Sequence, residues 1–408
     1  MRGQSRPLAF ILALTAHAYR NIGHLSGWPL CDDEYPRLAF ASGQGVIPLS
    51  ERKTNNREQL TKDEFTKKYL VTELDDIVYN PANVKYGAID RNKCGKGLIS
   101  PIYVTFITNE IPGFIERIVT SHHFQQRALR FEEGTVTKRQ SVNPEDFVTL
   151  DILIAPQREE QKKISECFDK LDSLITLHQR KCDEIIKLKK YMLQKMFPQN
   201  GRKVPEFRFA GFTGDWEQRK LSEIYRDIGN AFVGTATPYY VEKGHFYLES
   251  NNVKDGKINH NSEIFINDEF YEKQKDKWLH TGDMVMVQSG HVGHAAVIPE
   301  ELDNSAAHAL IMFRNLKVKI EPYFLNYQYQ TAKAKKKIEN ITTGNTIQHI
   351  LASEMQEFVV DMSSYDEQVK IAEFFGNLDN RITLHQNKCN ALIEVKKFML
   401  QNMFPQKG

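Results

Sequence analysis

Two segments of the 408-residue chain repeat apolar side chains in alternating steps of four and three residues. They span 160–199 and 367–406, align without a gap at an offset of 207 residues, and are identical at 25 of 40 positions. This spacing is the a/d pattern of a coiled-coil helix, and a helix of that length spans about 60 Å. The seam positions are Ile164, Phe168, Leu171, Ile175, His178, Cys182, Ile185, Lys189, Met192 and Met196 in the first copy, and Ile371, Phe375, Leu378, Ile382, His385, Cys389, Leu392, Lys396, Met399 and Met403 in the second.

Each predicted helix must bury its apolar seam, and the seam of the other copy is the most suitable partner surface. If the two halves of the chain are related by a pseudo-two-fold axis, the helices pair antiparallel. The seam also holds His178, His385, Lys189 and Lys396, and isolated polar groups in such a seam fix its register. We interpret the four residues in that way, and the two histidines as hydrogen-bonded or partly exposed residues rather than as metal ligands.

The segments that precede the helices alternate short apolar runs with Gly, Asn and Pro, which is typical of mixed α/β domains. In the first half the pattern predicts strands at 38–41, 76–79, 102–107 and 147–154, a helix at 112–130 and a loop around Gly134. In the second half it predicts strands at 246–249, 283–287, 295–298 and 309–314, a helix at 322–338 and a loop at 342–345.

Landmarks in the two halves match although the sequences differ. Asp76 and Asp283 each open an apolar strand and differ by 207 positions, whereas Pro112 and Pro322 differ by 210. The change in offset predicts a three-residue insertion between strand and helix. We infer two domains of one fold whose loops have diverged, which is how binding specificity is usually varied.

The predicted fold is therefore α+β, with two pseudo-two-fold-related mixed α/β domains separated by two long antiparallel coiled-coil helices. A polar linker rich in Pro and Gly joins the halves, and the position that corresponds to Trp216 in the first half, residue 9, has no similar sequence around it. We therefore expect an altered N-terminal edge in the first domain. The predicted division is a first domain at 1–156, a first helix at 157–199, a linker and entry segment at 200–222, a second domain at 223–364 and a second helix at 365–408.

The composition limits the kinds of binding site, compartment and membrane segment that the chain is expected to have. The net charge of +2 and the 41% hydrophobic content are ordinary, so nucleic-acid binding would have to come from local patches. Five cysteines without a CxxC pair predict reduced thiols in a cytoplasmic protein and no zinc site. Arg2 and Arg6 before the apolar run at 8–16 resemble a signal peptide, but we favour a first strand or helix, or an atypical N-terminus. No apolar run approaches the roughly 20 residues of a membrane span.

A search for catalytic chemistry finds none. The run 78–83 resembles the Asn-Pro-Pro-aromatic motif of amino-methyltransferases, but Ala82 and Asn83 stand where the second proline and the aromatic residue are needed. No glycine-rich loop precedes a helix, and His291 and His294 lack further ligands at metal-binding spacing. We therefore predict no catalytic residue, no metal site and no cofactor in this chain.

Side chains suited to nucleic-acid recognition gather on loops. Asn, Gln, Arg and Lys read base edges, and Ser, Lys and Tyr hold phosphates, although an ordinary solvated loop has a similar composition. A lysine run in the second half could likewise face phosphates or only solvent. The candidates are Asn80, Asn83, Lys85, Tyr86, Arg91, Lys93 and Lys96 in the first half, Gln288, Ser289, His291 and His294 in the second, and Lys333 and Lys336 in the lysine run.

The segments 204–212 and 216–224, together with the two Glu-Gln…Ile-Thr-Leu-His-Gln helices, resemble the specificity subunit of type I restriction–modification systems. The resemblance implies that each domain reads one half of a split DNA target and that the helices set the gap. It also implies that the helices bind two modification (methyltransferase) subunits, to which restriction (nuclease–translocase) subunits are added. Catalysis, S-adenosylmethionine, ATP and magnesium would belong to those partners.

Two other hypotheses remain. The chain could be a scaffold or decoy that binds methyltransferase subunits but no DNA, or an enzyme that joins recognition and chemistry. The absence of catalytic motifs disfavours the enzyme, and the divergent loops favour a DNA reader over the scaffold.

Overall fold

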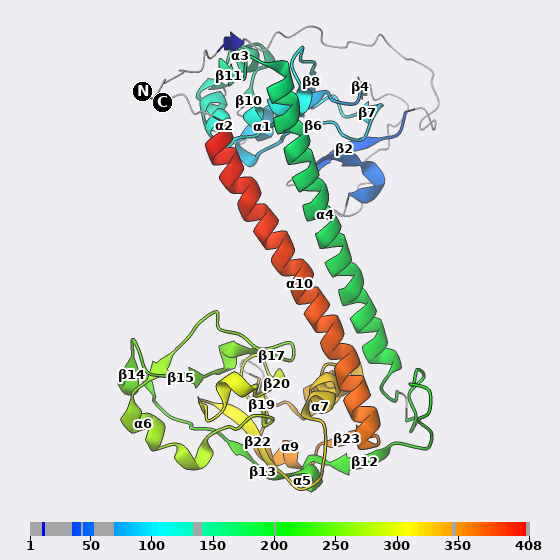
Figure 1. Ribbon diagram of the computed structural model, residues 1–408, viewed down its shortest axis with the longest axis vertical. Coiled ribbons are helices and arrows are strands. Elements are labelled where there is room, and N and C mark those ends of the chain that lie inside the picture. Colours follow the sequence, from blue (N-terminus) through cyan, green and yellow to red (C-terminus); the bar gives the residue numbers. More distant parts are fainter. Residues whose placement is uncertain are drawn as a thin grey trace, which may run out of the picture. The chain divides into compact units, whose positions relative to one another are not determined.

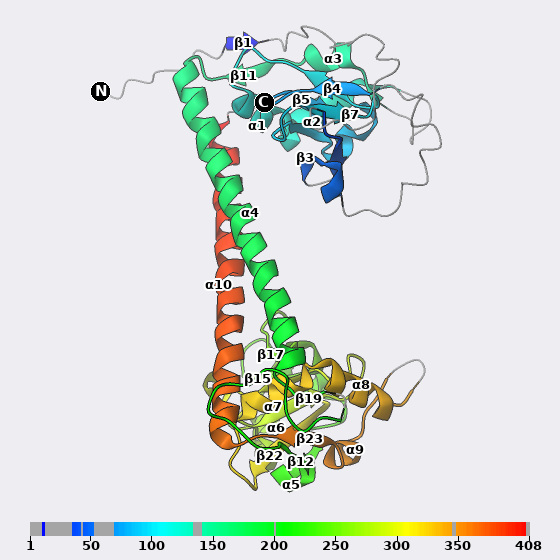
Figure 2. The same cartoon turned by 90° about the vertical axis from the view of Figure 1, so that its right-hand side faces the viewer.

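The computed structural model describes residues 10–12, 35–41, 44–52, 69–133, 141–199, 201–344 and 348–404. The chain forms two compact units, whose elements are labelled in Figures 1 and 2. Unit 1 contains Met1–His178 and Asn387–Gly408, and unit 2 contains Gln179–Gln386. Each unit therefore holds one mixed α/β domain and part of both long helices, whereas the division predicted from the sequence treats each helix as a separate segment.

Unit 2 has an antiparallel sheet in the order β13–β22–β19–β20. The bounds of these strands are Tyr225–Asn230, Leu310–Leu316, Met284–Val287 and Ala295–Val297, which confirms the strands predicted at 283–287, 295–298 and 309–314 to within two residues. All of β19 is buried. Met284 and Met286 join one core cluster and Val285 and Val287 another, so both faces of the sheet are covered.

A second sheet of unit 2 has the order β14–β18–β15–β21. Its strands span Tyr240–Val241, Phe265–Ile266, His245–Leu248 and Ala306–Ala307. Strand β15 pairs antiparallel with β18 and parallel with β21. The strand predicted at 246–249 is thus present one residue earlier. A short hairpin, β16 (Val253–Lys254) and β17 (Lys257–Ile258), follows β15.

Unit 1 repeats the central strands of unit 2 in the order β6–β5–β8. The bounds are Ile89–Arg91, Ile77–Tyr79 and Val104–Phe106. Ile77 pairs with Phe106 as Met284 pairs with Phe313, and both members of the two pairs differ by 207 positions. The predicted duplication of one fold is therefore confirmed at the level of strand register. The remaining strands are β2 (Leu38–Ala41), β3 (Gly45–Pro48), β4 (Leu70–Thr72), β7 (Gly97–Ile99), β9 (Glu132–Glu133) and β10 (Ser141–Val142).

The single helix predicted in each half is wrong, because each is two helices. Unit 1 has α1 (Pro112–Val119) and α2 (His122–Ala128), and unit 2 has α7 (Pro322–Tyr329) and α8 (Ala332–Ile341). The break has one cause in both units. Ser121 Oγ accepts the backbone N–H of Phe124 at 3.2 Å, and Thr331 Oγ1 accepts that of Ala334 at 3.2 Å, so each begins a new helix as its N-cap.

The strand predicted at 147–154 is also too long. Its first residues belong to α3 (Pro144–Val148), and only β11 (Ile152–Ile154) is extended. Phe147 is fully buried at the end of that helix, where its ring stacks 4.5 Å from the ring of Tyr79. Unit 2 has the same order, α9 (Ala352–Gln356) and then β23 (Val359–Met362).

An edge strand is present in both units. In unit 2, β12 (Glu217–Lys220) pairs antiparallel with β23, and in unit 1, β1 (Phe10–Leu12) pairs antiparallel with β11. Strand β1 begins 207 residues before β12, so the first domain has an edge strand at the equivalent position, and the alteration that we expected there is one of sequence and not a loss of the strand. Of the apolar run at 8–16 the structure describes this strand alone, and the rest of the run, with Arg2 and Arg6, lies outside the described residues.

The two long helices are α4 (Arg158–Lys195) and α10 (Tyr365–Met403), green and orange to red in Figure 1. They run antiparallel within each unit. In unit 2 Lys189 Nζ donates to Asp379 at 2.7 Å and Cys182 Sγ to Gln386 at 3.8 Å, so positions rise along α4 as they fall along α10. In unit 1 Lys396 pairs with Asp172 in the same sense. The two lysine–aspartate pairs join the same two repeat positions.

The seam residues differ in burial along the helices. Met403 is exposed, and the half-buried seam residues are Leu171, Ile175, His178, Lys189, Met192, Ile382, His385, Leu392, Lys396 and Met399. The two seam cysteines, Cys182 and Cys389, do not form a disulfide. The buried seam residues are Ile164, Phe168, Cys182, Ile185, Met196, Ile371, Phe375, Leu378 and Cys389.

One glutamine docks each long helix onto its domain. Gln161 Oε1 accepts the backbone N–H of Ile111 at 3.2 Å, and Gln368 Oε1 accepts that of Glu321 at 3.1 Å. Both glutamines are buried and stand at the same repeat position. In unit 2 the linker adds a second contact, because Arg208 forms two hydrogen bonds of 2.7 and 2.8 Å with the fully buried carboxylate of Glu367.

Three further observations concern the described part of the chain. No helix there is long and apolar enough to cross a membrane. No group of three or more potential metal-ligating side chains occurs there. The loops predicted at Gly134 and at Asn345 fall at least partly outside it.

Candidate nucleic-acid interface

The candidate recognition residues of unit 2 lie on the loop between β19 and β20. A second segment of backbone braces this loop, because Gly290 N donates to Gln348 O at 3.1 Å and Ile350 N donates to Gln288 O at 2.9 Å. Thr343 and His349 in turn pair with each other. The loop is therefore held as a shaped turn on the end of a buried sheet, with Ser289 half-buried and His291 exposed.

Helix α8 lies directly beside the loop. Gly293 has a φ of 85°, and a side-chain carbon there would stand 2.7 Å from Cγ2 of Ile338. This approach brings the lysine run of α8 to the candidate loop, as Lys335 acts electrostatically on His294. Lys254, on the β16–β17 hairpin, acts on the same imidazole. Lys335 and Lys336 are exposed, so they add positive charge to the surface around the loop.

Two lysines of the same run face the protein instead. Lys333 Nζ pairs with Asp361 and donates to Pro198 O at 3.1 Å. Lys337 Nζ donates to Val359 O at 3.1 Å, and burial, with Lys333 nearby, lowers its pKa. The prediction of Lys333 as a phosphate contact is corrected, because its ammonium is used inside unit 2. Lys336 remains a candidate.

Gln288 also needs a correction. Its side chain is only 5% exposed, at the end of the buried strand, and its Oε1 has no hydrogen-bond partner among the described residues. In this conformation it lies beneath the loop and cannot reach a base edge. We therefore assign Gln288 a supporting position, and leave His291, His294 and Ser289 as the surface candidates of the loop.

In unit 1 the equivalent loop contains η3 (Pro81–Tyr86) and leads to Gly87, whose φ is 72°. Tyr86 is 70% exposed and Lys85 Nζ lies 5.6 Å from its ring centre. An exposed aromatic ring beside an ammonium is suited to contact with nucleic acid. Helix α2 lies beside this loop as α8 does in unit 2, with Gln125 nearest to Gly87. Asn83 and Lys85 are half-buried and Lys96 is exposed, with its Nζ 4.1 Å from the ring centre of Tyr35.

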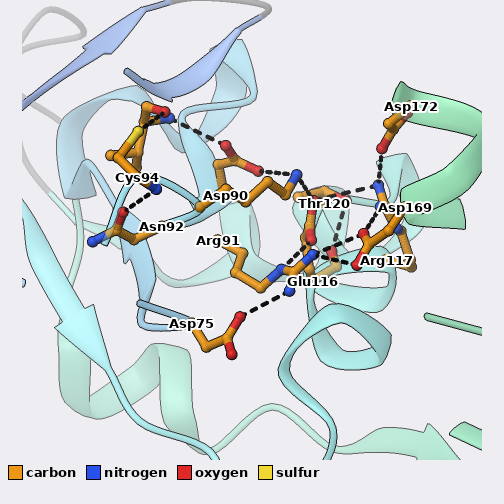
Figure 3. A network of polar contacts seen from close by, with 12 residues as sticks. Asp75, Asp90, Arg91, Asn92, Cys94, Glu116, Arg117, Thr120, Asp169 and Asp172 are labelled. Carbon is orange, nitrogen blue, oxygen red and sulfur yellow. Dashed lines mark hydrogen bonds and ion pairs between the residues drawn. The ribbon is translucent and has the colours of Figure 1, made fainter. Parts of the chain in front are cut away.

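Three candidates of unit 1 have internal partners. Asn80 is buried and its Oδ1 accepts the backbone N–H of Ala82, which caps η3. Arg91 donates to Asp75, Glu116 and Asp169 at 2.7–2.8 Å, and Lys93 donates to Glu116 at 2.6 Å (Figure 3). These contacts disfavour Asn80 and Arg91 as DNA contacts, since their polar groups are bound within the unit, and Lys93 stays a prediction. Lys93 keeps an exposed side chain but its ammonium is paired.

The network around Arg91 ties the domain of unit 1 to α4 (Figure 3). Arg117, only 5% exposed, pairs with Asp169 at 2.9 Å and with Asp172 at 2.9 Å. Burial alone would lower the pKa of Arg91, but Glu116 and Asp169 raise it above the ordinary value. Burial would raise the pKa of Asp172, but Lys396 and Arg117 lower it. These ion pairs stabilise the charged forms of Arg91 and Asp172, and they hold the domain on the helix.

The nucleic-acid candidates that sequence reasoning did not select are Lys254 and Gln125. Lys335 belongs to the lysine run of the second half, and no local pattern separates it from Lys333, whose partners are distant in sequence. Lys254 had no local signal, because it reaches the loop only through the hairpin that packs beside β20.

The chain is similar to known proteins in sequence and in fold. Residues 214–394 match the family model described as the type I restriction modification DNA specificity domain. The type I restriction enzyme MjaVIII specificity subunit of Methanocaldococcus jannaschii is 24% identical over 59% of this chain and 58% of its own length. The putative type I restriction enzyme MjaX specificity subunit of the same organism is 22% identical over 71% of this chain and 66% of its own length.

The fold is likewise similar to a solved one. The crystal structure of a type I restriction–modification system S subunit from M. genitalium superimposes with a TM-score of 0.58 and 13% identity, covering 84% of this chain and 85% of that one. The chain spans about six-tenths of the length of the curated relatives it matches. The resemblance inferred from the sequence is confirmed by the family model and by the curated relatives, and the solved structure shows the same fold.

Proposed function

We propose that this chain is the non-catalytic, DNA-reading subunit of a type I restriction–modification complex. Each unit reads one half of a two-part target in duplex DNA. The observation that carries the proposal is the identical register of β5–β8 and β19–β22 beneath loops of different chemistry. Tyr86 and Lys85 stand on one loop, and His291 and His294 on the other. An unchanged scaffold with changed loops is suited to reading two different base sequences.

The long helices support the spacer part of the proposal. Their seam is built from lysine–aspartate pairs at equal repeat positions and from buried aromatic residues such as Phe168 and Phe375. Such a pair of helices has one defined register. We infer that the register sets the gap between the two half-targets.

The outer faces of the helices support partner binding. Unit 2 exposes Ile186, Leu188 and Tyr191 on α4, and unit 1 exposes Ile393, Val395 and Phe398 on α10. These are the same three repeat positions, so the duplication has kept an exposed apolar surface on both helices. Repeated exposed apolar surface is typical of an interaction site. We propose that each copy binds one methyltransferase subunit and that restriction subunits join these.

Chemistry belongs to the partners in this proposal. S-adenosylmethionine would be used by the methyltransferase subunits, and ATP and magnesium by the restriction subunits, in the cytoplasm. A methylation map of cells that express the chain with its methyltransferase subunits should show a two-part motif with a fixed gap. A map without such a motif would contradict the proposal.

The spacer can be tested separately. Removing one heptad from each helix shortens it by about 10 Å, so the preferred gap should shrink. An unchanged gap would exclude the spacer role. Gel shifts of the assembled complex at several salt concentrations distinguish a reader from a scaffold, because phosphate contacts give a steep salt dependence and a scaffold gives no shift.

A further inference from the structure

We propose that His294 is the specificity-determining hydrogen-bond donor of the unit 2 loop, and that it donates from Nε2 as a neutral imidazole to an acceptor on a base edge. The inference rests on the proposed function and adds to it the chemical class of the group that is read. It differs from the ordinary expectation for a histidine near DNA, which is a cation that attracts phosphate.

The tautomer follows from one hydrogen bond. The backbone N–H of Asp255 donates to Nδ1 of His294 at 3.2 Å. An acceptor nitrogen carries a lone pair, so the ring proton of the neutral imidazole is on Nε2. The carboxylate of Asp255 lies 3.8 Å from Nδ1, which is beyond hydrogen-bond distance. The backbone amide, and not the carboxylate, therefore orients the ring.

The charges around the ring favour the same neutral form. Burial lowers the pKa of His294, and Lys335 on α8, His291 on the same loop and Lys254 on the hairpin lower it further. Asp255 is the only facing group described that acts in the opposite direction, and the pKa still falls below the ordinary histidine value. At neutral pH His294 is then a donor without charge, while the lysines beside it supply the attraction for phosphates.

Nε2 is the ring nitrogen of His294 that is available to donate to a ligand. The side chain is 30% exposed, and among the residues that the structure describes none forms a hydrogen bond with Nε2. Gly290 and Gly293 hold the turn in left-handed backbone conformations, and Gly293 rests on Ile338. The donor therefore lies on a rigidly held turn. A fixed donor position is required to discriminate between bases, whereas sequence-independent binding of DNA does not require it.

The chemistry defines which edges fit. In the major groove guanine presents N7 and O6, adenine N7 and thymine O4 as acceptors, whereas cytosine presents an amino donor. An Nε2–H donor accordingly selects against cytosine at one position of the half-target read by unit 2. A phosphate-binding cation would show no such preference.

Two substitutions separate these roles. His294→Gln keeps an N–H near the place of Nε2, and His294→Asn keeps an acceptor for Asp255 N–H but places no donor at that distance. The probe is a randomised pool of duplex oligonucleotides, selected with the chain assembled with its methyltransferase subunits. We expect His294→Asn to lose about tenfold in discrimination at one base pair, near the lower end of the usual cost of a mismatch, and His294→Gln to lose less than about threefold.

Lys335→Ala is the matched control. It should weaken binding to all sequences and reduce the salt slope by about one, without changing the selected motif. If the wild-type complex selects a motif and His294→Asn selects it with equal discrimination, the inference is wrong and the proposed function stands. If the wild-type complex selects no motif at all, the proposed function itself fails.

A direct reading of the ring does not depend on DNA. Nitrogen-15 NMR of the histidine-labelled chain at pH 7 should show His294 as a neutral ring with the proton on Nε2. An imidazolium signal, or a proton on Nδ1, would overturn the assignment. The His294→Asn spectrum identifies the resonance.

Discussion

Units 1 and 2 place an equivalent helix against an equivalent aspartate and use different side chains to hold it there. In unit 1, Arg117 of α1 pairs with Asp172 of α4. In unit 2, Tyr327 of α7 donates its hydroxyl to Asp379 of α10 at 2.9 Å. The two aspartates differ by 207 positions, and the equivalent lysines, Lys396 and Lys189, complete both sites.

The difference extends to the neighbouring residue. Glu116, buried beside Arg117, binds Arg91 and Lys93, whereas the equivalent Asn326 is buried and donates to Gly256 O at 2.8 Å. Beside the shared lysine–aspartate pair, unit 1 thus adds buried charges that must all be paired, whereas unit 2 adds the neutral groups of Tyr327 and Asn326. Both copies keep the same contact geometry between the domain and the long helix, whereas the side chains that form the contact differ.

The largest expected effect tests what the units share. Phe168 and Phe375 are fully buried at the same seam position. Replacing either by alanine should cost about 3–5 kcal/mol, and the two costs should agree to within about 1 kcal/mol, because both sites are packed aromatic cores. Chemical denaturation of the two variants measures this. A cost below about 1 kcal/mol in one unit would show that its helix is not held by the seam.

The next effect tests what differs. Arg117→Met leaves Asp169 and Asp172 without one partner, and we expect a loss of about 2–3 kcal/mol, less than for a fully buried pair because both carboxylates are partly exposed. The matched variant, Tyr327→Phe, removes one hydrogen bond and should cost about 1 kcal/mol. Hydrogen exchange measured by mass spectrometry reports each unit separately. Equal losses would mean that the charges in unit 1 have no special role.

The pH dependence of stability that Asp90 causes should be specific to unit 1. Burial raises the pKa of Asp90 to about 6, with Lys93 lowering it and Glu116 raising it. Because the folded-state pKa lies above the unfolded value, unit 1 loses stability as the pH rises from about 4 to about 6, by an amount on the order of 1–2 kcal/mol. Unit 2 has Ala296 at the equivalent position, since Val78 pairs with Asp90 as Val285 pairs with Ala296. Asp90→Asn should remove the dependence in stability measured against pH, and a dependence that survives this substitution would assign it to another group.

The smallest effect concerns the two lysines in the seam. Lys189 and Asp379 are each 13% exposed on the side chain, whereas Lys396 and Asp172 are 27% and 29% exposed. Lys189→Met should therefore cost slightly more than Lys396→Met, about 1 kcal/mol against about half of that. Double-mutant cycles with Asp379→Asn and Asp172→Asn measure the two couplings. The reverse order would contradict the difference in burial.

Local patterns predicted much of this fold. The heptad steps of 160–199 and 367–406 gave both long helices, and the strand at 38–41 has the predicted bounds. The helix breaks at Ser121 and Thr331 were missed, although an N-cap residue inside an apolar pattern is a local signal. The run at 8–16 was interpreted as a first strand or helix, and the structure has a strand at Phe10–Leu12. Its pairing with β11 had no local signal, because strand pairing keeps backbone geometry while side chains change.

The candidate site was less predictable, because the partners of its residues are far apart in sequence. Arg91 binds carboxylates that are 16, 25 and 78 residues away, and Lys333 binds one 28 residues away. No local pattern separates such a lysine from Lys335 or Lys336 on the same helix. Composition predicted which loops carry recognition chemistry, and the fold decided which side chains are available.

The central claim about the two units is that they read DNA independently of each other. Methylation maps should be recorded for the wild-type chain, with its methyltransferase subunits, and for a chain in which residues 289–294 of the unit 2 loop are replaced by a Gly/Ser linker of equal length. The account predicts that recognition of one half of the motif is relaxed or lost, while the other half and the gap are unchanged wherever methylation persists. A motif altered in both halves, or altered in neither, would contradict it.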